Sequence, residues 1–510
     1  MLASLAGCAR RDYGLADARP PAEAARPLPP GLDSVRGAAA GRHYATRGPL
    51  LRAVLGRHYR AVWAAPVAAP VFDVAHAAPG GGPLVPGKAG GGYQSITLGL
   101  TDRAGRPYVL RALDKDPRKV LPPLLRYTFV LNLVRDATSA ANPYAALVVP
   151  PLAEALGLPA AHPRLVYVRP ADAALGEASA HFAGRLALLE EKYNGHAAAR
   201  ALLNPATNLL DSEKMLAQVY ASSAARIDQK AYLQARLLDV LLGDWDRHER
   251  QWSWAARPGS APGSTLFQAI PKDRDQVFFR FDDGALPWLA THTVARNLQT
   301  FRACYGNVRG LVNQAHFIDE RGLPACTRAD FARAAAALQA HLPDTLLARA
   351  VRRFPPAVYA LEGPRTLAAL LARRATLPAA AAVFYRALAR RPVLAGTAQA
   401  EMFTVQRYAD SVTVRIGPHP AGGPETPFFT RTFYPTETRQ ITLEGLGGDD
   451  VFTVLPPPDG RRPAPIRLRL HGGPGRNVLT TNPSPRCRFS FDDGHATHPQ
   501  KQPYERLNDN

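Results

Sequence analysis

The sequence predicts an α+β protein in which a two-lobed domain is followed by a small all-β domain. Strand-like patterns between residues 96 and 191 come before helical patterns over 212–243 and 327–395. From about residue 396 the apolar residues alternate with period two, and turn residues separate the stretches. The chain has 510 residues, of which 46% are hydrophobic, so it is long enough to bury more than one core.

The amino terminus differs in composition from the rest of the chain. Leu5-Ala6-Gly7-Cys8 resembles a bacterial lipobox, which makes residues 1–8 a partial signal. The resemblance implies lipidation of Cys8 and a membrane anchor. It also implies an outer-membrane lipoprotein of the cell envelope that faces the periplasm or the surface. A working signal has about 7–15 apolar residues, so either the true start lies upstream or the match is accidental. Residues 9–50 are rich in Ala, Pro, Arg and Gly, which predicts a disordered tether without a core.

Composition also excludes several classes of function. The formal net charge is +20, but the basic residues are scattered and form no patch with stacking aromatics, so we expect no nucleic-acid partner. No apolar run is long enough to predict a membrane-spanning helix. Cysteine spacing indicates no zinc site, and Cys304 and Cys326 either form one disulfide or remain unpaired.

The amino-terminal lobe is expected over about residues 51–190. The glycines Gly90, Gly91 and Gly92 precede a strand at 96–100 and a return strand at 108–113, which predicts a β-hairpin behind a glycine-rich loop. Further strands are predicted at 165–168 and 186–191.

The carboxyl-terminal lobe is expected over about residues 191–395. Leucines at helical spacing predict a helix that begins after Asp228, a good N-cap residue, and stops at Gly243. Ala/Leu-rich helices are predicted over 327–395.

A β domain is expected over 396–492, with a tail at 493–510. Two Gly/Asp-rich segments, 446–452 and 472–479, faintly resemble the turns of calcium-binding β-rolls. Such sites need stacked repeats, so tight turns between strands are the alternative explanation.

One segment carries candidate chemistry. The leucine-rich helix leads into a polar loop that contains Asp246, His248 and Gln251, and a strand at 267–271 is followed by Asp273 and Asp275. Phosphoryl transfer needs one carboxylate to orient or deprotonate the attacking hydroxyl, and amide and carboxylate oxygens to hold Mg²⁺. Asp246 would be that carboxylate, Gln251, Asp273 and Asp275 the metal ligands, and His248 would buttress the loop.

Asp-Arg-His at 246–248, an amide five residues after the Asp, and the pattern Ile-Pro-x-Asp-x-Asp at 270–275 resemble the atypical kinases. Phosphatidylinositol kinases, secretory-pathway kinases and HipA-type kinases share the pattern, and spore-coat (CotH-type) kinases are most similar. The resemblance implies a two-lobed protein-kinase-like fold that uses Mg²⁺ and ATP. The glycines at 90–92 would cover the phosphates, and 186–191, with Glu190, would be the hinge at the nucleotide.

The chain departs from that pattern at the residue that grips the nucleotide. Arg111, at the end of the return strand, occupies the place where a lysine is expected, and Lys115 follows it in a predicted loop. Glu154 is a guess for the acidic helix partner of that cation. Gln251 stands where Asn is usual.

Structural explanations compete with the catalytic one. Asp244, Asp246, Arg247 and His248 could form a salt-bridge network beneath the helix end. A zinc site with His248 as ligand lacks a second ligand at suitable spacing. Tryptophan side chains are expected in the core, at 245, 252 and 254.

The same block also resembles an uncharacterised region of bacterial proteins that precedes an outer-membrane assembly-type (surface antigen) β-barrel. This implies a barrel protein as a partner, and a barrel would begin where this chain ends, at Asn510. The sequence therefore predicts an envelope-associated kinase-like protein with an unknown phosphate acceptor. The alternative is an inactive, kinase-shaped binding or scaffold module linked to such a barrel.

Overall fold

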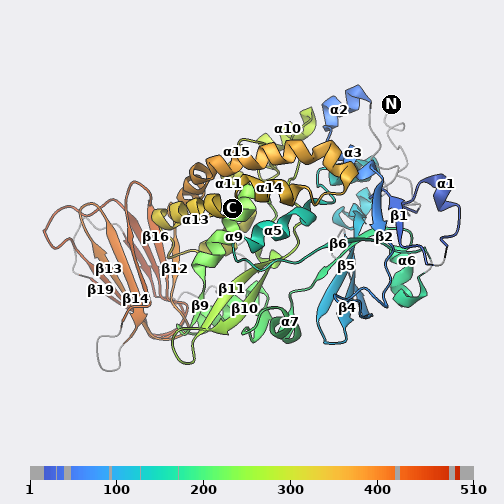
Figure 1. Cartoon of the computed structure of the whole chain (residues 1–510). Coiled ribbons are helices and arrows are strands. Elements are labelled where there is room, and N and C mark those ends of the chain that lie inside the picture. Colours follow the sequence, from blue (N-terminus) through green and yellow to red (C-terminus); the bar gives the residue numbers. More distant parts are fainter. Residues whose placement is uncertain are drawn as a thin grey trace.

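The structure is a computed structural model of the whole chain. It describes the ranges 17–29, 31–39, 48–90, 95–126, 128–170, 172–419, 426–481 and 489–493. The predicted lipidation site Cys8 and the glycines Gly91 and Gly92 lie outside these ranges. Figure 1 shows an amino-terminal sheet at one end, a helical region in the middle and a β domain at the other end, which confirms the predicted α+β order.

The amino-terminal lobe is built on a five-stranded antiparallel sheet with the order β3-β4-β5-β7-β6. These strands are β3 (Leu84–Gly90), β4 (Ser95–Asp102), β5 (Pro107–Lys115), β6 (Arg164–Tyr167) and β7 (Leu186–Glu191). β3 was not predicted, because most of its residues are exposed and hide the strand pattern. It ends at Gly90 and so adds a strand ahead of the predicted hairpin, which is formed by β4 and β5.

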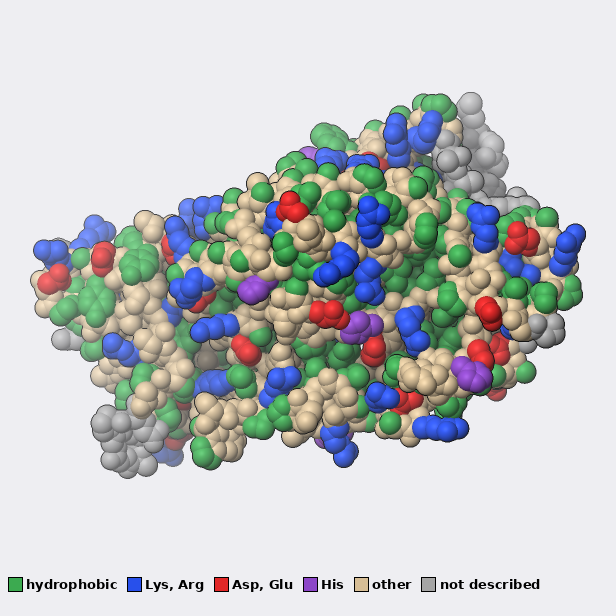
Figure 2. All heavy atoms as spheres, in the orientation of Figure 1, with side chains coloured by type: hydrophobic (Ala, Val, Ile, Leu, Met, Phe, Trp, Pro, Cys, Tyr) green, Lys and Arg blue, Asp and Glu red, His purple; other side chains and the backbone are tan. Residues whose placement is uncertain are grey.

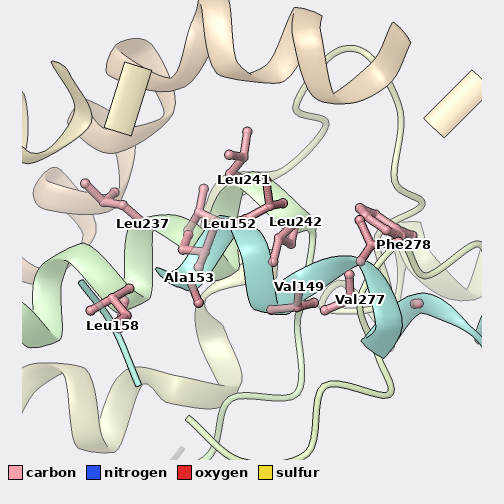
Figure 3. Packing of buried hydrophobic residues seen from close by; sticks show 14 of the residues in the cluster. Val149, Leu152, Ala153, Leu158, Leu237, Leu241, Leu242, Val277 and Phe278 are labelled. Atoms are coloured by element: carbon pink, nitrogen blue, oxygen red, sulfur yellow. The ribbon is translucent and has the colours of Figure 1, made fainter. Parts of the chain in front are cut away.

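Short helices lie between β5 and β7. They are α4 (Phe129–Thr138), α5 (Val149–Glu154) and α6 (Ser179–Phe182). Figure 3 shows α5 packed into the second lobe, where Leu152 and Ala153 lie beside Leu237 and Leu241. All four side chains are buried, so α5 joins the two lobes through one continuous apolar core.

The segment that precedes the sheet is folded as well. It contains α1 (Pro21–Ala24), β1 (Ser34–Gly37), α2 (Pro49–Leu55), α3 (Arg60–Ala64) and β2 (Val67–Pro70). β1 pairs with β2, and Val35 and Ala39 are buried in the main core. The prediction that residues 9–50 lack a core is therefore wrong for the described part. A few small apolar side chains suffice because they pack on a lobe that already exists.

The second lobe combines a small sheet, with the order β8-β10-β11-β9, and nine helices in the described residues. Its strands are β8 (Asn208–Leu210), β9 (Ala225–Ile227), β10 (Trp252–Pro258) and β11 (Thr265–Pro271). Its helices are α7 (Gly195–Leu202), α8 (Ser212–Ala221), α9 (Gln229–Leu242), α10 (Ala285–His292), α11 (Val308–Leu311), α12 (His316–Gly322), α13 (Arg328–His341), α14 (Asp344–Val351) and α15 (Pro356–Ala389).

Helix α9 delivers the polar loop, and its ends follow the sequence prediction. The Asp228 side chain accepts a hydrogen bond from Ala231 N at 3.0 Å, and Gly243 ends the helix with φ 71° in the left-handed region. Trp252 and Trp254 are fully buried against Tyr232, which confirms that they pack in the core, whereas Trp245 is partly buried and contacts Phe279.

Among the described helices, only α15 is long and apolar enough to cross a membrane by length and composition. It packs along α9, α13 and α14, and Figure 1 shows it lying across the top of the second lobe. Its buried Arg373 donates hydrogen bonds to the carbonyls of Val240 at 2.6 Å and Leu241 at 2.8 Å. These contacts are those of a core helix that clamps the end of α9.

The β domain holds nine described strands in two sheets, with the orders β12-β16-β18-β20 and β15-β14-β13-β17-β19. They are β12 (Val393–Ala395), β13 (Glu401–Arg407), β14 (Val412–Pro418), β15 (Phe429–Phe433), β16 (Gln440–Glu444), β17 (Val451–Leu455), β18 (Arg467–His471), β19 (Val478–Thr481) and β20 (Phe489–Asp492). From β16 onward the chain alternates between the sheets, and each of these strands pairs in parallel with an earlier strand of its own sheet. The Gly/Asp-rich segments are the tight turns between the sheets, and they stack on each other.

The stacked turns carry a ladder of polar side chains. Glu401, Asp450 and Asn477 each precede paired strand positions on β13, β17 and β19. Asp450 Oδ1 accepts from Glu401 N at 2.9 Å, and Asn477 Oδ1 accepts from Asp450 N at 3.2 Å. Asn477 Nδ2 also donates to Gly473 O at 2.7 Å, whereas the buried Asp450 Oδ2 has no hydrogen-bond partner. An ionised carboxylate has no N–H to donate, so Asp450 cannot make the kind of hydrogen bond to a carbonyl oxygen that the Asn477 amide makes.

We predict that Asp450→Asn stabilises the β domain at alkaline pH. Burial raises the pKa of Asp450 to about 7. Because the pKa is higher in the folded chain than in the unfolded chain, the protonated carboxyl favours folding. This stability is present below the unfolded pKa and is lost as the pH rises through 7. The amide removes that loss, so we expect a gain on the order of 1 kcal/mol or more at pH 8 and little gain at pH 4. Urea midpoints at the two pH values measure it, with the exposed Asp449→Asn as control. Equal destabilisation at both pH values contradicts the prediction.

Candidate active site

A cavity of about 240 Å³ lies between the lobes. Thr97, Val109 and Arg111 line it from the amino-terminal sheet, and residues 190–193, which follow the buried part of β7, form its rear wall. The second lobe contributes residues 271–274, after β11. The predicted hinge and the predicted metal-binding segment therefore face one cavity.

Antiparallel pairing of β10 with β11 brings the two polar segments together. Trp252 pairs with Pro271, so the residues just outside the hairpin, Gln251 and Lys272, are also neighbours. Lys272 N donates to Gln251 O at 2.9 Å. The fully buried Arg247 spans the junction and donates to Gln251 O at 2.9 Å and Lys272 O at 2.7 Å. The loop and the segment after β11 are thus held in one fixed arrangement.

Asp246 is only partly buried, and it faces the other carboxylates. Burial and the neighbouring Asp275 carboxylate raise the pKa of Asp246 to about 6, and Asp273 adds to the effect. The Gln251 side chain hydrogen-bonds to Asp246 and favours its ionised form. His248 Nε2 lies 3.8 Å from Asp246 Oδ1. Three carboxylates from two segments therefore share one electrostatic environment.

His248 shapes the loop. Its Nδ1 accepts a hydrogen bond from Arg250 N at 3.2 Å and caps the single 3-10 turn Glu249–Gln251. That turn places the Gln251 side chain beside Asp246. This cap fixes the shape of the loop, and the buttressing role expected for His248 stays a prediction.

The cations that line the site differ from the sequence predictions in position. Arg111 lies in the middle of β5, not at its end, and bridges Asp273 and Glu190 with N–O distances of 3.2 Å to each. Lys115 is the last residue of that strand, not part of a loop, and it forms an ion pair with Asp275. Burial works against ionisation of Asp275, but Lys115 holds its pKa below the usual value.

Glu190 and Glu154 are the two acidic residues to consider as partners of Arg111. Burial raises the pKa of Glu190, and Arg111 offsets only part of that rise. Glu154, the guessed acidic partner on a helix, instead pairs with His162 on the surface at 2.5 Å. The acidic partner of Arg111 in the amino-terminal sheet is therefore Glu190.

Asp273 has a left-handed backbone, with φ 52°. Aspartate tolerates this conformation better than most residues with a side chain. The turn ends β11 and directs the carboxylate toward Arg111. Gly90 pairs with Thr97, which lines the cavity, so the end of β3 lies at its edge.

The alternative of a structural salt-bridge network is correct for half of the residues it named. Asp244 and Arg247 are fully buried and share ion pairs with Asp239 and Arg274, at 3.3 Å between Arg247 and Asp239 and between Arg274 and Asp244. Asp246 and His248 remain partly exposed, and Asp246 shares its surroundings with Asp273 and Asp275. The loop thus alternates between residues that hold the fold and residues that face the site.

Sequence reasoning missed several contributors to this site. Lys272 and Arg274 line the cavity between and beside the predicted metal ligands, and Val149 and Ala153 of α5 line its far side. Burial lowers the pKa of Lys272. Lys272 and Arg274 alternate with Asp273 and Asp275 in the sequence, and this alternation of charge could have marked them as site residues. No local signal marks α5, because only the fold brings it to the cavity.

The donor set fits magnesium in part. Carboxylate and amide oxygens are the ligands that Mg²⁺ prefers, and Gln251, Asp273 and Asp275 would supply them. Within the described residues no three His, Cys, Asp or Glu side chains form a ready-made metal cage. Mg²⁺ commonly binds through one or two carboxylates together with substrate phosphates.

Comparisons with known proteins give little guidance. No family model matches the chain, and no curated protein sequence matches it. The structure of the Helicobacter pylori proinflammatory kinase CtkA aligns with a TM-score of 0.32 and 12% identity, over 59% of this chain and 95% of that chain. The Rio2 kinase of Chaetomium thermophilum, in an ADP/Mg²⁺-phosphoaspartate complex, aligns with a TM-score of 0.22 and 14% identity, over 55% and 72%. Similarity at this level carries no functional argument.

Proposed function

We propose that the chain transfers a phosphoryl group from Mg²⁺-ATP to an acceptor hydroxyl. The observation that carries the proposal is the convergence of Asp246, Asp273 and Asp275 beside a cavity between two lobes. Two segments about twenty residues apart supply these carboxylates, and buried side chains hold both segments in place. Carboxylates set beside a cavity between two lobes are what phosphoryl transfer requires.

The roles follow from position and charge. Asp246, with a pKa near 6, is mostly ionised at neutral pH and can accept the proton of a hydroxyl. Gln251, Asp273 and Asp275 would hold the metal, which neutralises charge on the phosphates when bound. Arg111 and Lys115 lie beside these carboxylates and would contact phosphate oxygens in place of a single lysine.

We place this activity in the cell envelope, at the outer membrane, facing the periplasm or the surface. The support is the Leu5–Cys8 pattern, which implies a lipid anchor at Cys8. In that compartment, the phosphate acceptor and a barrel partner would lie on the same side of the membrane as this protein. The acceptor is a hydroxyl group of protein, lipid or glycan.

The proposal is tested by nucleotide binding to the full chain. ATP with Mg²⁺ should stabilise the native state by about 3–4 kcal/mol at 100 to 1,000 times its dissociation constant. Mg²⁺ alone should have little effect, because no described cluster of acids forms a cage. Asp273→Ala should abolish the stabilisation, and Asp344→Ala, at an exposed position, should retain it. Thermal unfolding of the wild type and of the two variants at several ATP concentrations measures the stabilisation.

The result that overturns the proposal is an absence of stabilisation in the wild-type chain, or one that Asp273→Ala leaves intact. That result would favour the second candidate, an inactive kinase-shaped module that binds or scaffolds an envelope partner such as a β-barrel. One observation favours this candidate: Arg111 and Lys115 already pair with Asp273 and Asp275. Those ion pairs compete with a metal for the same oxygens.

A further inference from the structure

Six large apolar side chains are exposed on two short helices. Leu50 and Leu51 lie on α2, and Leu286, Trp288 and Leu289 lie on α10, with Val294 just after it. All six are 45–89% exposed. Helices α2 and α10 contact each other, and Figure 2 shows hydrophobic side chains along that upper edge of the molecule. We call these six residues the apolar edge.

The apolar edge is held rigidly. His58, just after α2, donates its backbone N–H to Asp283 Oδ2 at 2.7 Å, and its ring pairs with Asp283 Oδ1 at 2.6 Å. Gly284, at the start of α10, lies so close to Gly56 that a Cβ there would be 2.0 Å from its backbone nitrogen. The two helices are therefore presented together, as one preformed surface.

The same surface is basic. Residues 48–60 and 285–303 contain five arginines and no Asp or Glu, and of these five only Arg60 is buried, in an ion pair with Asp136. Arg52, Arg57 and Arg296 are exposed. Figure 2 shows basic side chains beside the hydrophobic ones on α2. An apolar edge flanked by positive charge is complementary to the headgroup region of an anionic bilayer.

A cavity of about 230 Å³ lies between Tyr59, which follows α2, and Phe301, which follows α10, and its charged lining is entirely arginine. Arg280, Arg302 and Arg365 line it, together with Tyr59. Glu362 pairs with Arg280, and Asp282 pairs with Arg302. Arg365 has no ion-pair partner in the described part of the chain. The buried Arg280 Nε also lacks a hydrogen-bond partner. This arrangement favours a phosphate group.

We propose that α2 and α10 dock this protein on an anionic phospholipid bilayer, with the apolar edge in the headgroup boundary and the arginines on lipid phosphates. Trp288 lies in the middle of the edge, with its ring 4.2 Å from that of His292. Tryptophan favours the membrane interface because one end of its ring is apolar and the other is polar. This contact is independent of the phosphoryl transfer proposed above, and of any lipid on Cys8.

Vesicle flotation tests the proposal with the full chain, produced as Cys8→Ser so that no lipid is attached. Wild type should float with vesicles that contain phosphatidylglycerol and less with phosphatidylcholine alone. Leu286→Ser with Leu289→Ser should weaken the binding about tenfold or more, because both side chains lose their apolar contact. Val85→Ser with Val478→Ser removes exposed apolar side chains from other elements and should bind as wild type does.

A second pair separates charge from apolar contact. Arg302→Gln with Arg365→Gln should reduce binding to phosphatidylglycerol vesicles toward the level seen with phosphatidylcholine. The proposal is overturned if wild type does not float, or if the leucine variant floats as well as wild type. It is also overturned if wild type is a dimer in solution that the leucine variant converts to a monomer, since a second copy would then cover the edge.

Discussion

Asp246→Asn is expected to lower phosphoryl transfer about 100- to 10,000-fold while nucleotide binding persists. The amide keeps the size of the side chain and its contact with Gln251, but it cannot accept a proton from the acceptor. It also removes one negative charge beside Asp273 and Asp275, so Mg²⁺-ATP should bind no more weakly than in wild type. Transfer of labelled phosphate from ATP into the chain or to water measures the rate.

The matched control is Glu249→Gln, which makes the same type of change three residues further along the loop. It should transfer phosphate at the wild-type rate, since Glu249 belongs to the 3-10 turn after Asp246, and the carboxylates that act on Asp246 are Asp273 and Asp275. If Asp246→Asn retains the wild-type rate, Asp246 is not the base. If it loses ATP binding as well, the carboxylate serves to bind ligand and not to move a proton.

Asp239→Ala is expected to destabilise the second lobe by about 3–5 kcal/mol. Asp239 is fully buried and pairs with Arg236 at 2.7 Å, with Arg247 at 3.3 Å and with Arg274. Although burial opposes ionisation, these three arginines hold the pKa of Asp239 below its usual value. Its removal leaves buried positive charge without compensation, which is the costly outcome.

Guanidinium unfolding followed by tryptophan fluorescence measures this, because Arg247 lies over the buried Trp252 ring at 4.6 Å. Asp344→Ala is the control: it breaks an ion pair with Arg374 of similar length, 2.6 Å, but at an exposed position. That change should cost less than about 1 kcal/mol. An equal effect of the two substitutions would show that burial does not govern this network.

Asp239 lies in α9 and Asp246 in the loop that follows this helix. The buried Arg247 ties Asp239 to the backbone after β11, whereas Asp246 is partly exposed and shares its surroundings with Asp273 and Asp275. The buried ion pairs thus support the position of the candidate base. A weakened network should disturb the site as well as the fold, and a change at Asp246 should disturb the site alone.

Local patterns were sufficient for the elements that carry their own signals. The period of the leucines and the capping residues Asp228 and Gly243 predicted α9, and alternation predicted the strands of the β domain. The spacing of Asp246, Gln251 and Asp273 predicted that they would meet, because a short hairpin returns the chain to its start. Exposed β3 and the small apolar residues around β1 carry no such signal, and they were missed.

The α+β class, the order of lobes and the candidate carboxylates were therefore contained in the sequence, because they depend on residues close together along the chain. The tertiary structure alone decided the partners of those carboxylates. Arg111 and Lys115 lie about 160 residues before Asp273 and Asp275 and meet them only when the lobes pack through α5. The tertiary structure also separated Asp246 from Asp244 and Arg247. Asp244 and Arg247 are buried and structural, whereas Asp246 stays partly exposed at the candidate site, and no local sequence pattern reports burial.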